Sequence, residues 1–163
     1  LFVGTKKQAK DAVKAAAEKV NQPYVTERWI GGMLTNVATV NQQIKKLKDL
    51  ERRMESGDLE KRYSKLEVQR FGEEIEELNI KYGGIKELSG RPGAVIVTDV
   101  LVDDGAVREA KVLGVPVVAI VDTNADPSGV DYVVPGNDDA IKGTTLLLDY
   151  FAAAVAEGKK KEN

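Results

Sequence analysis

The stretches AVIVT (residues 94–98) and PVVAIV (residues 116–121) decide the fold of this chain. Both are apolar and lack the alternation of polar residues that marks a half-exposed strand. Strands buried on both faces have this pattern, and they occur in parallel sheets that carry helices on each side. Between the two stretches, apolar residues recur at helical spacing until Gly114. The segment therefore predicts one strand–helix–strand unit of a parallel sheet.

The same alternation of strand and helix extends on both sides of this unit. Short apolar runs predict further strands at 1–3, 24–25 and 132–134. Because strands and helices alternate, we predict an α/β fold in which a parallel sheet lies between two layers of helices. Helices are expected from about Lys6 to Val20, after a cap at Asp103 and Asp104, and after an acidic first turn at 137–139.

Residues 35–82 interrupt this alternation. Apolar residues recur at heptad spacing from Val37 to Met54, and Glu51 occupies the one expected apolar slot between them. A second apolar run at spacings of three and four follows a Ser-x-x-Glu capping motif at 64–67. We expect two helices that fold back on each other as an antiparallel coiled-coil hairpin.

This hairpin divides the chain into two parts. Residues 1–34 and 83–163 are expected to form one discontinuous α/β domain, with 35–82 as the inserted hairpin. Gly72 lies inside the second helix, where glycine costs about 1 kcal/mol relative to alanine, so we expect a close helix crossing there. Long insertions in compact domains are usually functional, which favours an arm that reaches a partner; a purely stabilising elaboration is the alternative.

The composition narrows the classes of chemistry that are open to the chain. It contains no cysteine and no histidine, which excludes disulfides and thiolate chemistry and removes the commonest general base near neutral pH. We expect no metal and no cofactor. No apolar run approaches the ~20 residues of a membrane span, as is typical of a soluble protein. The chain begins at Leu1, inside an expected strand, so we expect it to be a piece of a longer protein.

The charge is distributed unevenly along the chain. Residues 1–34 carry six Lys/Arg against three Asp/Glu, a net of +3, and residues 35–82 are neutral, with ten of each sign. Residues 83–163 carry eight Lys/Arg against thirteen Asp/Glu, a net of −5, so the whole chain has a net charge of −2. A basic front and an acidic back predict that a polyanion meets one face only.

A basic segment lies where the first strand passes into the first helix. Lys6 and Lys7 stand at the expected first turn, where each cation is unfavourable by roughly 0.3–1 kcal/mol, and Lys10 continues the same face. A phosphate group would compensate these charges. No GxGxxG or GxxxxGK[ST] motif follows the strand, so RNA backbone is preferred over a nucleotide as the source of the phosphate. A solvated lysine face partly neutralised by Asp11 and Glu18 is the alternative.

The segment RWIGGMLTN (residues 28–36) joins a cation and a large ring to a pair of glycines. Paired glycines allow a tight turn and close approach to another surface. Arginine and tryptophan beside such a turn suit contact with nucleic acid. We expect Trp29 to pack under the loop and Arg28 to point outward as the contact; a simple core anchor is the alternative for Trp29.

Two aspartates, Asp99 and Asp122, support a competing hypothesis of an enzyme or a nucleotide-binding module. They follow the two buried strands, at the edge where open α/β sheets place their active sites. Two carboxylates there can hold magnesium or share acid–base work. No nucleophile accompanies them, and aspartates that bond to loops are common at this edge, so the structural interpretation is favoured.

Four separated motifs carry a family resemblance: FVGTKKQA (2–9), RWIGGMLTN (28–36), VPVVAIVDTNADP (115–127) and PGNDDAI (135–141). In this order they resemble the family of the second protein of the small ribosomal subunit, in its bacterial and organellar form. The resemblance covers essentially the whole chain, including the hairpin and the GGIKEL segment at 83–88. The family usually carries a His-containing segment where this chain reads Asp-Asp-Gly-Ala at 103–106.

The resemblance implies a flavodoxin-like domain that carries the hairpin and a non-catalytic role in the small ribosomal subunit. It implies contact with small-subunit ribosomal RNA near the head–body junction and with other small-subunit proteins, including the largest one, protein one. It also implies a cytoplasmic location, with an organellar ribosome as the alternative. By motif position the RNA-facing residues are Lys6, Lys7, Lys10, Arg28, Gly31, Gly32, Thr35 and Asn36, and Lys45, Lys46 and Lys48 extend this surface along the hairpin.

Overall fold

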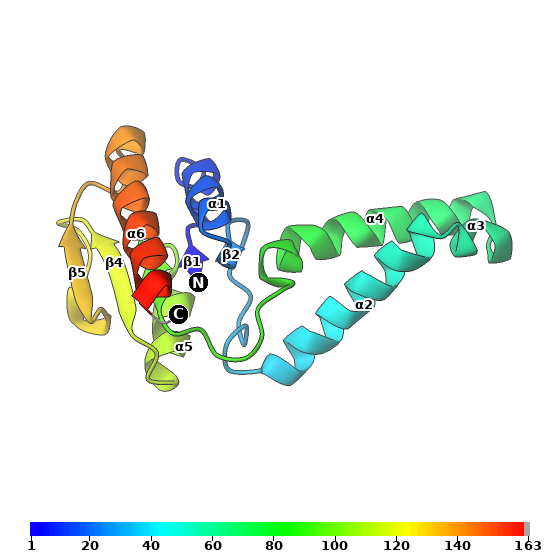
Figure 1. Ribbon diagram of the computed structural model, residues 1–163, viewed down its shortest axis with the longest axis horizontal. Helices are drawn as coiled ribbons and strands as arrows, with labels where there is room; N and C mark the ends of the chain where they lie inside the picture. The colour runs from blue at the N-terminus through cyan, green and yellow to red at the C-terminus, as the bar shows by residue number, and fades with distance from the viewer. Residues whose placement is uncertain (162–163) are drawn as a thin grey trace.

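The computed structural model describes residues 1–161, which form one five-stranded sheet with helices on both faces (Figure 1). Every pair of neighbouring strands is parallel, and the strand order is β2-β1-β3-β4-β5. The predicted α/β fold with a parallel sheet is therefore confirmed, and this order is that of flavodoxin-like sheets. The strands are β1 (Phe2–Val3), β2 (Tyr24–Val25), β3 (Val95–Val97), β4 (Val117–Val121) and β5 (Tyr132–Pro135).

Side chains that alternate along the strands build two hydrophobic layers. Phe2 of β1 and Ile96 of β3 point to the face covered by α1 (Lys10–Lys19) and α6 (Ile141–Lys161), which lie side by side. Val3, Val95 and Val97 point to the opposite face, covered by α5 (Asp104–Val112). Burial on both faces explains why these strands have no polar alternation.

Helices α2 (Val37–Glu55) and α4 (Lys65–Tyr82) follow the edge strand β2 and pack against each other. The chain runs away from the sheet along α2, turns through the short helix α3 (Asp58–Arg62), and returns along α4 to the 3₁₀ turn η1 (Gly83–Ile85) (Figure 1). We call α2, α3 and α4 the helical arm. Its apolar side chains join the core of the sheet without interruption: Val40, Ile44, Leu47, Leu50, Leu78 and Tyr82 belong to the same buried cluster as the β3 valines.

Local signals at the helix ends of the arm agree with the sequence. Ser64 and Glu67 form the predicted capping box at the start of α4. The side chain of Asn36 caps α2 by accepting a hydrogen bond from the backbone amide of Thr39 at 3.4 Å. Each cap satisfies amide groups that have no partner within their own helix.

Glu51 in the heptad pattern has a structural explanation. Its carboxylate accepts hydrogen bonds from Lys86 Nζ at 2.6 Å and from the side-chain amide of Asn79 at 2.7 Å. Burial alone would raise the pKa of Glu51, but these hydrogen bonds lower it overall. The neighbouring residue Leu50 is buried, so the apolar packing of the arm continues beside the polar contact. Glu51 thereby ties both arm helices to the segment that returns to the sheet.

The prediction of a close helix crossing at Gly72 is wrong. A Cβ atom at this position would meet no other atom within 4 Å. Gly84, at the base of the arm, is the glycine on which packing depends, because a Cβ there would lie 2.2 Å from the carbonyl oxygen of Tyr24 in β2.

Replacing Gly72 with alanine should therefore raise the free energy of unfolding by about 0.5–1 kcal/mol, because it removes the entropic cost of glycine in a helix. Chemical denaturation of the purified chain measures the change. The matched variant Gly84→Ala should destabilise the protein by about 1–3 kcal/mol through the clash with β2. A destabilising Gly72→Ala would show that this side of α4 is packed.

Candidate nucleic-acid interface

Lys7 and Arg28 extend from the same edge of the sheet. Strands β1 and β2 pair in parallel, with Phe2 opposite Tyr24 and Val3 opposite Val25, so the loops that follow them leave at the carboxyl edge together. Both cations are exposed, and neither forms an ion pair with any residue of the described chain, 1–161. Two adjacent loops thus present two uncompensated positive charges at one end of the sheet.

Lys10 connects the two loops directly. Its ammonium group lies 2.6 Å from the Glu27 carboxylate, in the residue just before Arg28. Lys10 stands at the start of α1 and is less exposed than Lys7. The ion pair therefore links the loop that carries Arg28 to the start of α1, and it engages an ammonium group that was expected to meet an external anion.

The segment 29–35 is held in place by the carboxylate of Glu109 in α5. Glu109 Oε1 accepts hydrogen bonds from Trp29 Nε1 at 3.0 Å and from the Gly32 amide at 2.7 Å. Its Oε2 accepts from the Leu34 amide at 2.9 Å and from both the amide and the hydroxyl of Thr35 at 3.1 Å. Burial alone would raise the pKa of Glu109, but these donors lower it overall, so the carboxylate is ionised at neutral pH.

Packing completes this anchorage. The ring of Trp29 lies against Gly105 of α5, where an added Cβ would come within 2.9 Å of it. Met33 and Leu34 are buried beneath the loop, and Trp29 packs against the same core. The prediction that Trp29 supports the loop while Arg28 stays exposed agrees with these contacts.

The polar residues of the loop have internal roles. Gly32 has a φ of +87°, a left-handed conformation that favours glycine, and exposed Gly31 precedes it. Thr35 bonds to Glu109, and Asn36 caps α2. These contacts shape the loop, and whether the same residues also touch RNA stays a prediction.

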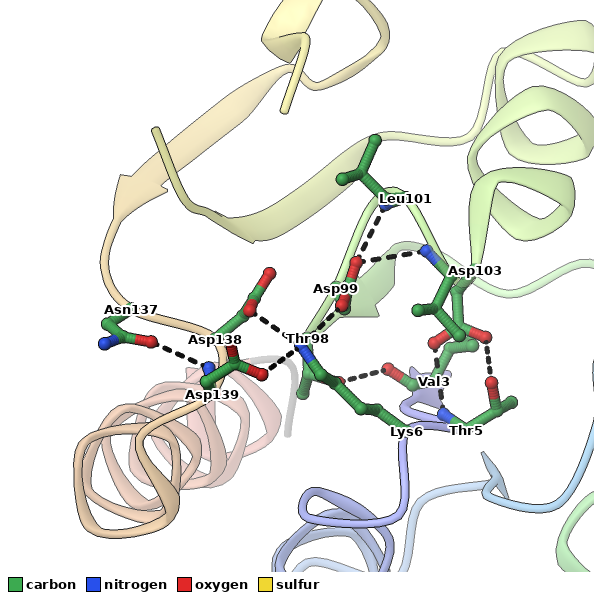
Figure 2. A network of polar contacts seen from close by, with 11 residues as sticks. Val3, Thr5, Lys6, Thr98, Asp99, Leu101, Asp103, Asn137, Asp138 and Asp139 are labelled. Atoms are coloured by element: carbon green, nitrogen blue, oxygen red, sulfur yellow. Dashed lines mark hydrogen bonds and ion pairs between the residues drawn. The ribbon is translucent and has the colours of Figure 1, made fainter. Parts of the chain in front are cut away.

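Lys6 occupies a different environment from the one the sequence suggested. Its ammonium group lies 3.0 Å from Asp99, 2.8 Å from Asp138 and 2.6 Å from Asp139 (Figure 2). Helix α1 begins at Lys10, so Lys6 precedes the helix by a full turn. The premise that Lys6 is an uncompensated cation at a helix start is therefore wrong. Burial disfavours the charged ammonium, but the three carboxylates raise the pKa of Lys6 overall.

The acidic side chains of this network come from two loops. Asp99 follows β3, and its carboxylate also accepts hydrogen bonds from the amides of Leu101 and Val102 at 2.9 and 3.0 Å. Asp138 and Asp139 precede α6, which was expected to use them in its first turn; the structure directs both to Lys6 instead (Figure 2). The network thus joins the loops after β1, β3 and β5.

Asp103 makes a second contact between the loops after β1 and β3. It holds the N-cap position of α5 but makes no capping hydrogen bond, and its side chain accepts from the amide of Thr5 at 3.1 Å and from the Thr5 hydroxyl at 2.7 Å (Figure 2). Burial raises the pKa of Asp103, and the two hydrogen bonds only partly offset this effect. The predicted cap is therefore replaced by a contact between β1 and α5.

The structure gives Asp99 and Asp122 different partners. Asp99 is buried and engaged by Lys6, whereas Asp122 accepts a hydrogen bond from the Thr123 amide at 2.6 Å in its own turn. Asp126 makes a similar local turn with Ser128 ahead of the 3₁₀ helix η2 (Pro127–Gly129). In the described residues no group of three or more His, Cys, Asp or Glu could hold a metal ion. Within the same range no helix is long and apolar enough to cross a membrane.

The three lysines of α2 differ in their surroundings. Lys46 pairs with Glu74 of α4, and Lys48 lies 2.8 Å from Glu87 in the segment that returns to the sheet. Lys45 is exposed and has no ion pair within residues 1–161. Of these arm lysines, Lys45 alone presents an uncompensated charge in the part of the chain that the structure describes.

Sequence reasoning missed Glu109 as a functional candidate. Its five hydrogen-bond donors lie 74 to 80 positions earlier in the chain, and no local motif marks such a distant pairing. The one available signal was indirect: a loop rich in glycine must satisfy its exposed amides with some acceptor. The same reason explains why Asp138 and Asp139 were assigned to their own helix.

Replacing Lys6 with methionine should lower the free energy of unfolding by about 2–4 kcal/mol, because it leaves buried Asp99 and Asp138 without a counter-ion. Lys7→Met is the matched control, since exposed Lys7 has no such partner, and its effect should stay within about 0.5 kcal/mol. Urea denaturation of both variants measures the difference. Equal effects would contradict a structural role for Lys6.

Asp99 should also make the free energy of unfolding depend on pH in the acidic range. Burial would raise the pKa of Asp99, but its hydrogen bonds and Lys6 hold it below the ordinary value of 3.8, so its stabilising contribution is present above that pH and is lost as the pH falls through the folded pKa. The free energy of unfolding of the wild type should exceed that of Asp99→Asn by about 1.5–3 kcal/mol at neutral pH, and this difference should shrink as the pH becomes acidic. Chemical denaturation of both proteins at neutral pH and at acidic pH measures this difference. A difference that stays constant would contradict the prediction.

The sequence matches the family model described as Ribosomal protein S2 over residues 1–158. The matched range includes the five strands of the sheet, the helical arm and every residue of the site described above. It agrees with the resemblance that the separated sequence motifs indicate.

Proposed function

The chain belongs to the ribosomal protein S2 family, and from this premise we propose that it binds small-subunit ribosomal RNA through the carboxyl edge of its sheet. The family implies a structural role in the small ribosomal subunit. The proposal adds the surface: Lys7 and Arg28 contact the phosphate backbone, and the rigid loop at 29–35 sets the position of Arg28.

One observation carries this proposal. Lys7 and Arg28 are exposed and have no ion pair in the described chain, and they lie at an edge where Lys6 and Lys10 have internal partners. When an exposed unpaired cation neutralises a phosphate, counterions condensed on the nucleic acid are released, which favours binding. Arginine adds a planar group that can bond to phosphate with two donors.

We extend the proposed surface along the helical arm. Residues 35–82 act as an inserted arm of the α/β domain, and the unpaired ammonium of Lys45 continues the contact with RNA on α2. Lys46 and Lys48 contribute less, since Glu74 and Glu87 neutralise them. The free energy of the contact then comes mainly from the sheet edge, with the arm as a second point of attachment.

Neighbouring small-subunit proteins, including the largest one, are the proposed protein partners. Several apolar side chains are exposed on β5 and α6, among them Tyr132, Leu146 and Tyr150. Exposed aromatic and aliphatic groups are typical of protein contacts. The particle belongs to the cytoplasm or to an organelle.

The function we propose is non-catalytic. A catalytic role would need Asp99 and Asp122 free to act on a substrate at the carboxyl edge. Instead Asp99 holds Lys6, and Asp122 shapes its own turn. The crevice in which flavodoxin-like sheets bind ligands, between the loops after β1 and β3, contains the Lys6 network.

Single alanine substitutions of Lys7 and Arg28 should each weaken binding to small-subunit ribosomal RNA, and the loss of affinity should not depend on the RNA sequence at the contact. Each should reduce the slope of log affinity against log salt by about 1, because each removes one phosphate contact. Filter binding at several salt concentrations measures both quantities.

Arg91→Ala is the matched control for this experiment. Arg91 is an exposed arginine with no ion pair in residues 1–161, but it precedes β3 and so lies at the amino edge of the sheet. Its loss should leave the salt slope unchanged. An equal decrease for Arg91→Ala and Arg28→Ala would show that RNA responds only to total charge, and the proposed surface would be wrong.

A further inference from the structure

We propose that Glu109 is a positioning residue for RNA binding: it fixes the loop at 28–36 in its binding arrangement before RNA arrives. The inference rests on the proposed function, since it concerns how Arg28 reaches the RNA. It assigns a role at the RNA interface to an acidic residue of α5. Glu109 itself makes no contact with RNA in this scheme.

The geometry makes Glu109 the main polar attachment of the loop. Its two oxygens accept five hydrogen bonds, from a side chain at one end of the loop to a side chain and an amide at the other. The loop lies outside helices and strands, so Gly32, Leu34 and Thr35 have few other acceptors for their amides. One carboxylate therefore spans the loop from Trp29 to Thr35.

Glu109 belongs to a helix that is packed against the sheet. Ala106 and Ala110 of the same helix are both buried there. The carboxylate is thus fixed relative to β1, β3 and the loop that carries Lys7. Arg28 adjoins Trp29, the first residue of the bonded segment, so its backbone is placed before any partner binds. A preordered contact avoids the entropy that a mobile loop would lose on binding.

The negative charge of Glu109 makes the direction of the expected change in RNA affinity informative. Glu109 is negative and lies beside a surface that meets a polyanion, so removing its charge should strengthen RNA binding if only long-range electrostatics acts. A positioning role predicts the opposite, since the loop loses its attachment. The direction of the change therefore separates the two effects without any assumption about their size.

The variant Glu109→Gln tests the inference in the full chain with intact small-subunit ribosomal RNA as the probe. Glutamine keeps the shape but carries one oxygen, so its NH₂ group must face either Trp29 and Gly32 or Leu34 and Thr35, and one half of the loop loses its acceptor. If the loop then holds the binding arrangement about a tenth of the time, the apparent Kd rises about tenfold.

Asp104→Asn is the matched control on the same helix. It removes the same charge from α5, but the Asp104 carboxylate pairs with Arg108 and forms no hydrogen bond or ion pair with the loop within residues 1–161. Its RNA affinity should be unchanged or slightly higher. Trp29→Phe is a second test variant, which can be used if Glu109→Gln folds poorly. It keeps a ring on Gly105 and removes one of the five hydrogen bonds, so its loss of affinity should be smaller.

Two further readouts separate positioning from a general loss of stability. Hydrogen exchange of the Gly32, Leu34 and Thr35 amides should accelerate in Glu109→Gln, whereas amides of β4 keep their protection. Arg28→Ala should cost less affinity in the Glu109→Gln background than in the wild type, because Arg28 is no longer placed.

The outcomes are distinct. Weaker binding with faster loop exchange and a reduced effect of Arg28→Ala supports the inference. Unchanged or tighter binding, or a full effect of Arg28→Ala in both backgrounds, overturns it while leaving the proposed interface intact. If Arg28→Ala has no effect even in the wild type, the proposed interface fails and the positioning role falls with it.

Discussion

Carboxylates in the second half of the chain hold the loops of the first half at the carboxyl edge of the sheet. Lys6 bonds to aspartates from two later loops, Thr5 bonds to Asp103, and Glu109 binds the loop that contains Trp29 and Thr35. These loops follow strands that are only two or three residues long, so the strands alone fix their direction weakly. The polar contacts across the edge give the surface its shape.

The same contacts change the meaning of the charge distribution. The sequence has a basic front and an acidic back, which suggests one face for RNA and an unrelated anionic face. In the structure part of the acidic excess lies at the same edge of the sheet as the basic loops: Asp99, Asp138 and Asp139 surround the ammonium group of Lys6, and Glu109 accepts hydrogen bonds from loop amides. Lys7 and Arg28 remain unpaired in the first segment, whereas Lys6 and Lys10 have internal partners, so fewer cations are available there than the sequence count implies. Net charge by segment therefore overestimates the surface that a polyanion can meet.

The sequence was sufficient for elements whose signal is local. The five strands, the capping box at Ser64 and the support of the loop by Trp29 follow from patterns within a few residues. The partners of Lys6 and Glu109 do not, because each pairs with groups more than 70 positions away, and the sign of a charge says nothing about which opposite charge it meets. The prediction of a close helix crossing at Gly72 failed for a related reason. A glycine can occur in a helix for several reasons, and only the neighbouring atoms distinguish them.

The Lys6 network also bears on how a flavodoxin-like sheet can serve an RNA-binding protein. Such sheets bind small ligands in the crevice between the loops after β1 and β3, which stays open because those loops diverge. Here a lysine from the first loop and Asp99 from the second meet in that place, and Asp103 draws the loops together through Thr5. With these side chains between the two loops, the edge suits contact with an extended phosphate backbone better than binding of a small ligand in the crevice. A buried ion pair contributes little net stability compared with apolar packing, so its value here lies in the single arrangement that it imposes on three loops.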